Sequence, residues 1–154
     1  MIDKPKVVNC PEQLTASIHL TVPRSEIRTV MGPGLREVNA ALKAQGIGTS
    51  GPWLTHHLKM DPKVFDFEIC LPVEKPVSAV GRVKPGKLPA RKVARTVYHG
   101  DYEGLEKAWG ELSAWVKAEG HKSAPDLWEV YTSGPEASSD PSAWRTELNQ
   151  PLLD

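Results

Sequence analysis

Apolar and polar residues alternate with a period of two in three runs of the first half of the chain. The clearest run is "QLTASIHLTVP" at residues 13–23, where every second residue from Leu14 to Val22 is apolar. "PWLTHHLKM" and "VFDFEICL" follow on either side of the turn pair Asp61-Pro62. A period of two sends successive side chains to opposite faces, so the three runs predict half-buried β-strands.

A period of three to four residues predicts two helices. "GLREVNAALKAQG" places Leu35, Val38 and Leu42 on one face. "YEGLEKAWGELSAWVKAEG" has a longer apolar face. That face consists of Leu105, Ala108, Trp109, Leu112, Trp115 and Val116. Gly46 and Gly120 follow the last apolar positions, and glycine is favoured just beyond the end of a helix.

The second half repeats the elements of the first, with one additional predicted strand before its helix. "VSAVGRVK" and "RKVARTVYH" are typical of strands, and they precede the second helix. "DLWEVYTSG" and "AWRTELNQ" follow it as two further strands, joined by the loop "PEASSDPS" at residues 135–142. Each half therefore contains a β-α-β-β unit.

Four landmarks recur in the same order in the two halves. "IRTVMGPG" is matched by "ARTVYHGDY", "LKAQG" by "VKAEG", Trp53 by Trp128, and "FEICLPV" by "TELNQPL". The pattern predicts a duplication, with one repeat at about residues 13–73 and the other at about 77–152. The expected fold is a single α+β domain over residues 1–154. It has an antiparallel sheet, both helices on one face and a pseudo-twofold axis.

A glutamate stands in the last strand of each repeat. Alternation places Glu68 and Glu147 on the face that points away from the apolar side chains. That face is either an ordinary solvated surface or the floor of a cleft between the repeats, where ligand sites are common.

Composition and charge narrow the function classes. The chain has 154 residues, 40% of them hydrophobic, and a formal net charge of zero, which argues against direct nucleic-acid binding. It has neither a signal peptide nor an apolar run that could span a membrane, so we expect a cytoplasmic protein without a membrane partner. In that reducing compartment Cys10 and Cys70 are expected to be free thiols.

Familiar catalytic and metal-binding motifs are missing from the sequence. "GRVKPGK" resembles a phosphate-binding loop but lacks the Ser or Thr that would follow it, so we expect a hairpin turn. The basic residues there fit a protected sheet edge better than a phosphate site. They are Arg82, Lys84, Lys87, Arg91, Lys92 and Arg95. The five histidines lack metal-ligand spacing, and we expect neither a metal nor a cofactor.

Three motifs of the second half carry a resemblance to a known family. "HGDYEGL" at the start of the helix, "EVY…P" in the next strand and "TEL..PL" at the end resemble the GyrI-like small-molecule-binding family. That family includes the effector-binding domains of multidrug-sensing transcription activators of the MerR and AraC types. The resemblance implies two β-α-β-β units with pseudo-twofold symmetry and a pocket between them. "VMGPGLREV" in the first half departs from the pattern.

The resemblance also implies site residues. A glutamate of the family's last strand lies in the pocket, which here corresponds to Glu147, and Glu68 shares its motif. The aromatic residues matched to the pocket are Tyr131, Trp109, Tyr98, Trp53 and Trp128. Tyr102 is assigned a packing role instead. A carboxylate among aromatic rings suits a lipophilic cation, because charge pairing and cation–π contact offset its desolvation.

Two functions of different classes remain open. The first is a stand-alone sensor or sequestering protein for hydrophobic, often cationic, small molecules, since the chain has no segment for a helix-turn-helix domain. The second is a hydrolase that opens cyclopropane rings of DNA-alkylating natural products, with Glu147 as base and Tyr131 as acid or hydrogen-bond partner. A weaker alternative, from the family name, is a protein that interacts with DNA gyrase.

Overall fold

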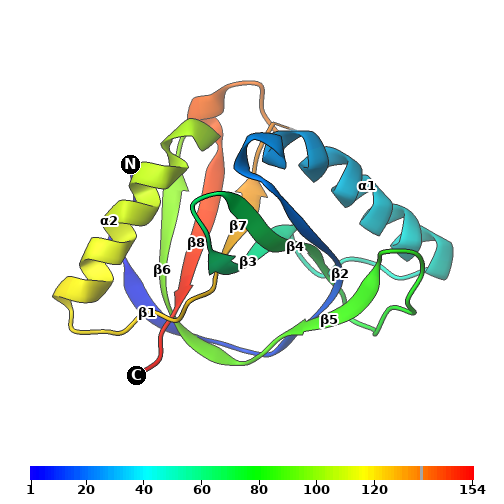
Figure 1. The fold of residues 1–154 in the computed structure, drawn as a ribbon, viewed down its shortest axis with the longest axis horizontal. Helices are drawn as coiled ribbons and strands as arrows, with labels where there is room; N and C mark the ends of the chain where they lie inside the picture. The colour runs from blue at the N-terminus through cyan, green and yellow to red at the C-terminus, as the bar shows by residue number, and fades with distance from the viewer. Residues whose placement is uncertain (136) are drawn as a thin grey trace. The chain divides into compact units, whose positions relative to one another are not determined.

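The computed structural model describes residues 1–135 and 137–154, with residue 60 described by its backbone alone. The chain forms two compact units (Figure 1). The first unit is Pro11–Ala90. The second combines Met1–Cys10 with Arg91–Asp154. Residue 136 of the predicted loop at 135–142 lies outside the described residues.

The first unit is a four-stranded antiparallel sheet with one long helix. Its strands stand in the order β3-β4-β2-β5. In chain order its elements are β2 (Gln13–Pro23), the 3₁₀ turn η1 (Arg24–Glu26), α1 (Ile27–Gln45), β3 (Leu54–Met60), β4 (Val64–Pro72) and β5 (Lys84–Leu88).

Helix α1 packs on β2 and β4 through the apolar face predicted from the sequence. Val38 and Leu42 are buried against Ala16 and Ile18 of the sheet. The close approach depends on Gly34, where an added Cβ would lie 2.5 Å from Cδ1 of a β4 isoleucine. A larger residue at this position would force either that isoleucine side chain or the helix to shift.

The predicted start of α1 was wrong, and its predicted end is confirmed. The helix begins at Ile27, a full two turns before the expected start, and continues through Pro33. Proline removes only one backbone donor, and the packing of the following turns on the sheet outweighs that loss. Gly46 ends the helix in the left-handed region with φ 66°, as a glycine stop should.

The second unit has the same plan. Its strands stand in the order β1-β6-β8-β7, all antiparallel, and α2 runs alongside β6 (Figure 1). In chain order its elements are β1 (Lys6–Cys10), β6 (Arg91–His99), the 3₁₀ turn η2 (Tyr102–Gly104), α2 (Leu105–Ala118), β7 (Leu127–Ser133), the 3₁₀ turn η3 (Pro141–Ala143) and β8 (Arg145–Pro151).

Helix α2 covers one face of this sheet, as its periodicity predicted. Leu112 and Val116 are almost fully buried and pack with Ala94 of β6 and Leu148 of β8. Trp109 and Trp115 lie at the margin of the same core. Both units are therefore antiparallel sheets with a helix on one face, and the predicted α+β class is confirmed. Within the described residues, no helix is both long and apolar enough to cross a membrane.

Two edge strands differ from the prediction. β1 was not predicted, and it pairs with β6 of the second unit. The predicted strand "VSAVGRVK" and the turn "GRVKPGK" are shifted, because the turn closes between Val80 and Val83 and β5 follows it at Lys84–Leu88. Gly86 lets β5 approach β2, since a Cβ there would lie 2.7 Å from a threonine hydroxyl oxygen of that strand.

Equivalent backbone hydrogen bonds recur in the two units and support the predicted duplication. In each unit, one bond connects the residue after the C-terminal glycine to the last turn of the helix. A second connects the loop after the helix to the end of the unit's last strand (β4 or β8). A third connects the residue that follows that strand to β2 or β6. The pairs are Ile47 N–Leu42 O and His121 N–Val116 O, Ser50 N–Pro72 O and Ala124 N–Pro151 O, and Val73 N–Leu14 O and Leu152 N–Lys92 O, all between 2.9 and 3.0 Å.

One of the four landmarks does not correspond to the same structure in both units. "IRTVMGPG" lies in α1, whereas "ARTVYH" lies in β6. The other three landmarks fall at equivalent places, at the helix ends, near the start of the third element and in the last strand. The similar letters of the first pair are therefore coincidental.

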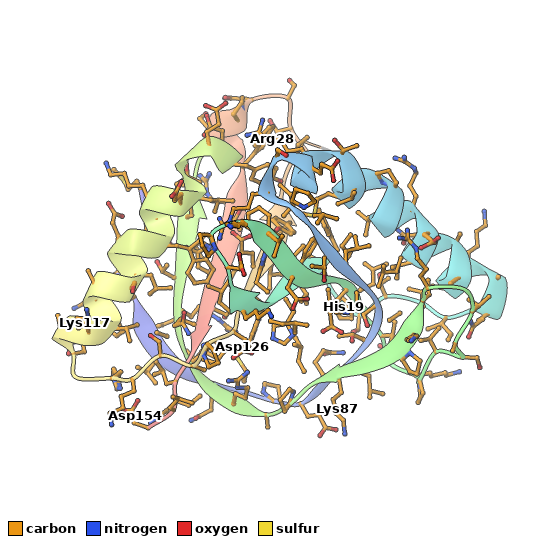
Figure 2. The ribbon with its side chains drawn as sticks, in the orientation of Figure 1. His19, Arg28, Lys87, Lys117, Asp126 and Asp154 are labelled. Carbon is orange, nitrogen blue, oxygen red and sulfur yellow. The ribbon has the colours of Figure 1, made fainter. Side chains whose placement is uncertain are left out.

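The basic segment between residues 82 and 95 is largely paired with acids. Arg82 bonds Glu37 at 3.0 Å, and Lys87 (Figure 2) lies 3.6 Å from a glutamate near the start of β2. Arg91 holds Asp126 through two nitrogens, one of them at 3.0 Å. The protected-edge interpretation fits Lys84 and Lys87 on β5, which is an edge strand. It was wrong for Arg91, Lys92 and Arg95, because β6 pairs with both β1 and β8.

Candidate functional site

Strand β7 carries a buried glutamate on the helix side of the second unit. Alternation along "LWEVY" places Glu129 and Tyr131 on one face and Trp128 on the other. Glu129 pairs in register with Leu148, a core residue, so its side chain lies on the face that α2 covers. Only 8% of Glu129 is exposed.

Two neutral groups donate hydrogen bonds to the Glu129 carboxylate. The indole N–H of Trp109, on α2, donates to Oε2 at 3.0 Å. The phenol of Tyr131 donates to Oε1 at 3.2 Å. Burial raises the pKa of Glu129, and these two hydrogen bonds oppose the rise. The carboxylate is thus held in place by donors that carry no charge of their own.

Two more aromatic rings extend this arrangement. Tyr102 of η2 meets Tyr131 edge to face, with ring centroids 5.9 Å apart. Its other side contacts Trp144 at 5.1 Å, and the Trp144 indole N–H donates to a backbone oxygen at 2.8 Å. We call Glu129, Trp109, Tyr131, Tyr102 and Trp144 the aromatic cluster. Tyr102 thus has the packing role predicted for it, but its partners belong to the cluster.

Tyr98 packs against the turn that carries Tyr102 of the aromatic cluster. It is buried in the core of the second unit, and its hydroxyl lies against Gly104, where an added Cβ would be only 2.1 Å away. Burial raises the pKa of Tyr98. Because Gly104 ends the turn that carries Tyr102, the contact fixes the position of that ring.

Glu147 lies on the opposite face of the same sheet. Its neighbours Leu148 and Thr146 face the core, as alternation predicted. Its carboxylate is 3.3 Å from Nε of Arg95 and accepts a hydrogen bond from the Asn149 amide at 3.1 Å. The structure does not bring Glu147 to the aromatic cluster, and its role in ligand binding stays a prediction.

The remaining predicted site residues have other surroundings. Trp128 is 3% exposed and pairs in register with Asn149, on the face that carries Glu147. In the first unit, Glu68 lies 3.4 Å from Nδ1 of His56, and Trp53 packs against the core beside α1. Of the predicted residues, Trp109 and Tyr131 are brought to one carboxylate.

That carboxylate is Glu129, which the sequence interpretation missed. Tyr131 was predicted from "EVY", and Glu129 stands two positions before it in the same strand. Strand alternation puts residues i and i+2 on one face, so the tyrosine already implied its acidic neighbour. Trp144 was missed because its contacts come through the turn η3, which the alternation of β8 does not describe.

The aromatic cluster can bind a cation or exchange a proton. A buried carboxylate beside aromatic rings attracts a positive group by charge pairing and cation–π contact. The hydrogen bond between Tyr131 and Glu129 also joins a proton donor to a base. No group of three or more metal-ligating side chains is found among the residues that the structure describes.

Comparison with known proteins adds the following findings. Residues 3–153 match the family described as GyrI-like small molecule binding domain. A search of curated proteins gave no match. The C-terminal domain of EcmrR is similar in structure, with a TM-score of 0.87, 24% identity and 98% of each chain covered.

Two further structures extend the comparison. The EcmrR chain in a complex with DNA gives a TM-score of 0.85 and 25% identity over 97% of this chain, which spans only 57% of that protein's length. A protein named SAV2435, bound to tetraphenylphosphonium, gives 0.68 and 13% identity, with 97% of this chain and 94% of that chain covered.

Proposed function

This chain belongs to the family of GyrI-like small molecule binding domains, and we propose that it binds hydrophobic cations at the aromatic cluster. The observation that carries the proposal is the buried carboxylate of Glu129, held by the neutral donors of Trp109 and Tyr131. Burial disfavours its charged form, and a bound cation would restore that form.

The rings around Glu129 supply the rest of the affinity. Each well-placed ring face adds about 0.5–2 kcal/mol to the binding of a cation, and the same rings bury apolar parts of a ligand. Tetraphenylphosphonium has one positive charge within an apolar shell and fits these requirements. SAV2435, which shares the fold, was determined with that cation bound, and this supports the choice of probe.

The proposed role is that of a sensor or a sequestering domain in the cytoplasm. EcmrR, whose C-terminal domain has the same fold, was determined in a complex with DNA. This chain spans 57% of that protein's length and matches its C-terminal domain. We propose that this domain binds a small molecule.

The test compares two glutamates of adjacent strands. We expect Glu129→Gln to weaken the binding of tetraphenylphosphonium at least tenfold, or about 1.4 kcal/mol, in isothermal titration calorimetry at pH 8. Glu147→Gln is the matched control, because it removes the same charge from the other face of the sheet. Equal weakening by the two variants, or a loss with Glu147→Gln alone, would reject the aromatic cluster as the site.

A second candidate function is hydrolysis of cyclopropane rings conjugated to a carbonyl group. The hydrogen bond of 3.2 Å between Tyr131 and Glu129 favours it, because an acid and a base already share a proton path. Glu129 would take a proton from water while the water oxygen bonds to a ring carbon. The strained C–C bond would then break, and its electron pair would move to the carbonyl oxygen, which takes the Tyr131 proton. Glu129 would return a proton to Tyr131.

Ring opening can be followed by mass spectrometry with a duocarmycin-type compound that contains the cyclopropane. We expect wild-type protein to accelerate the addition of water, and Tyr131→Phe to lose most of that acceleration while it still binds tetraphenylphosphonium. A rate equal to that in buffer, measured for a protein that binds the compound, would eliminate the hydrolase.

A further inference from the structure

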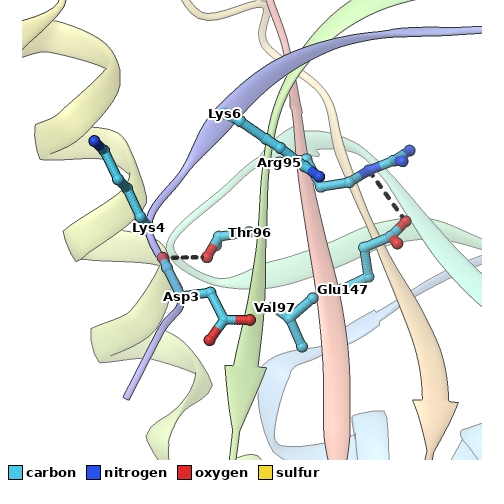
Figure 3. Close-up of a pocket in the computed structure, with 7 residues that line it drawn as sticks. All are labelled: Asp3, Lys4, Lys6, Arg95, Thr96, Val97 and Glu147. Carbon is cyan, nitrogen blue, oxygen red and sulfur yellow. Dashed lines mark hydrogen bonds and ion pairs between the residues drawn. The ribbon is translucent and has the colours of Figure 1, made fainter.

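The second unit has a hollow on the face of the sheet that α2 does not cover. It measures about 280 Å³ and is lined by residues of the N-terminal segment, β6 and β8. The lining residues are Asp3, Lys4, Lys6, Arg95, Thr96, Val97 and Glu147. Figure 3 shows the ion pair between Arg95 and Glu147 and the hydrogen bond from Thr96 to the backbone of Asp3.

The unbalanced charges in this hollow are positive. The carboxylate of Glu147 is paired with Arg95, and that of Asp3 lies 2.8 Å from a ring nitrogen of His99. In contrast, the ammonium groups of Lys4 and Lys6 have neither an ion pair nor a hydrogen bond to any residue that the structure describes. The hollow is therefore lined by three cationic side chains and two acidic ones, one of which is paired with Arg95.

Arg95 is held in a fixed position by buried and half-buried groups. Asn149, which is fully buried, accepts from the Arg95 Nε at 2.7 Å, and the sulfur of Cys10 lies 3.0 Å from Nη2. The amide of Asn149 also donates to Glu147. Lys6, Arg95 and Asn149 pair in register across β1, β6 and β8, so their side chains share one face. A pre-positioned guanidinium loses little side-chain entropy when it binds an oxyanion.

We propose that this hollow binds a small molecule through a phosphate group, with Lys4, Lys6 and Arg95 as the binding residues. The guanidinium of Arg95 provides a planar set of N–H donors in a fixed position, and the two lysines provide positive charge on flexible side chains. Asn149 holds Arg95 in position, and Glu147 competes with the anion for it. The hollow is larger than one phosphate group needs, so the ligand is a phosphate ester of a small molecule. This site is independent of the aromatic cluster.

The first test measures binding of inorganic phosphate by calorimetry at constant ionic strength. We expect the double variant Lys4→Gln/Lys6→Gln to weaken it at least tenfold. Both side chains are exposed, so the fold should be unaffected. The control is Lys107→Gln/Lys117→Gln on the exposed face of α2 (Lys117 is labelled in Figure 2), which changes the net charge equally. Equal weakening by both double variants would overturn the proposal, as would the lack of saturable binding to wild-type protein.

The second test uses Glu147→Gln, which should increase the affinity for phosphate instead of lowering it. Loss of the carboxylate that competes for Arg95 should strengthen phosphate binding by about threefold, because a partly exposed ion pair is screened by solvent and its net contribution is small. Weaker binding in this variant would contradict the proposed arrangement. Glycerol phosphate is the other probe. Tighter binding of the ester identifies a phosphorylated small molecule as the ligand, and tighter binding of inorganic phosphate would overturn that assignment.

Discussion

Glu129 and Glu147 lie on adjacent strands, β7 and β8, on opposite faces of one sheet, and their surroundings differ in kind. Glu129 accepts from an indole and a phenol and is 8% exposed. Glu147 pairs with a guanidinium and accepts from an amide, and 23% of its side chain is exposed. The indole and the phenol that donate to Glu129 are both neutral, whereas Glu147 has the positive charge of Arg95 beside it.

This difference shows how two identical side chains can be suited to opposite ligands. A buried acid that accepts from neutral donors suits a cation in our proposal, because burial disfavours its charged form and a positive ligand favours it. An acid that is already paired with arginine belongs to a cluster in which positive charge predominates, and that cluster favours an anion. In our proposals, the ligand that suits each carboxylate depends on its partners more than on its position in a strand motif.

The largest expected difference between the two faces concerns stability. Leu148→Ala removes a fully buried side chain under α2 and should lower the free energy of unfolding by about 2–5 kcal/mol. Val97→Ala, on the half-buried face that carries Glu147, should cost about 1 kcal/mol or less. Urea unfolding followed by circular dichroism measures both. Equal losses would contradict the assignment of the core to the helix side.

A smaller effect is expected at the hydrogen bond from α2 to Glu129. Trp109→Phe keeps a ring but removes the indole N–H that donates at 3.0 Å. The charged carboxylate loses a donor worth about 1–2 kcal/mol, so tetraphenylphosphonium should bind roughly five- to thirtyfold more weakly. Trp115→Phe, on the same helix, is the matched control. If both variants bind alike, the indole N–H has no part in the site.

The smallest expected effect is the pH dependence of stability. Burial raises the pKa of Glu129 in the folded state above its ordinary value of 4.5. The contribution of this group to stability is therefore complete below pH 4.5 and is lost as the pH rises through the raised pKa. The loss of stability with rising pH should be absent in Glu129→Gln and present in Glu147→Gln. Urea titrations between pH 4.5 and 8 measure the difference, and parallel curves for the wild type and Glu129→Gln would contradict it.

Most of the fold could be predicted from periodicity. The strands β2, β4 and β6 and the helix α2 have regular alternation or a regular apolar face, and their predicted bounds are close to those observed. The start of α1 was missed because Pro33 reads as a helix boundary, although tertiary packing carries the helix past it. The edge strands β1 and β5 are short and have weak alternation, so only their pairing reveals them.

The site was harder to predict than the fold. Several glutamates stand beside aromatic residues, and local patterns do not distinguish among them. The family resemblance favoured the glutamate of the last strand. Partners such as Trp109 for Glu129 and Arg95 for Glu147 lie 20 and 52 positions away. Such partners depend on helix packing and strand register, which local patterns do not encode. Alternation correctly placed Glu147 away from the helix, but it could not identify what surrounds either acid.

The most direct test of the central claim is the pH dependence of cation binding. Tetraphenylphosphonium has no titratable proton, so any pH dependence of its affinity belongs to the protein. The affinity of the wild-type protein should rise with pH through the raised pKa of Glu129, because the cation binds the ionised carboxylate. The rise should persist in Glu147→Gln and disappear in Glu129→Gln. A rise that survives in Glu129→Gln and is lost in Glu147→Gln would contradict the account.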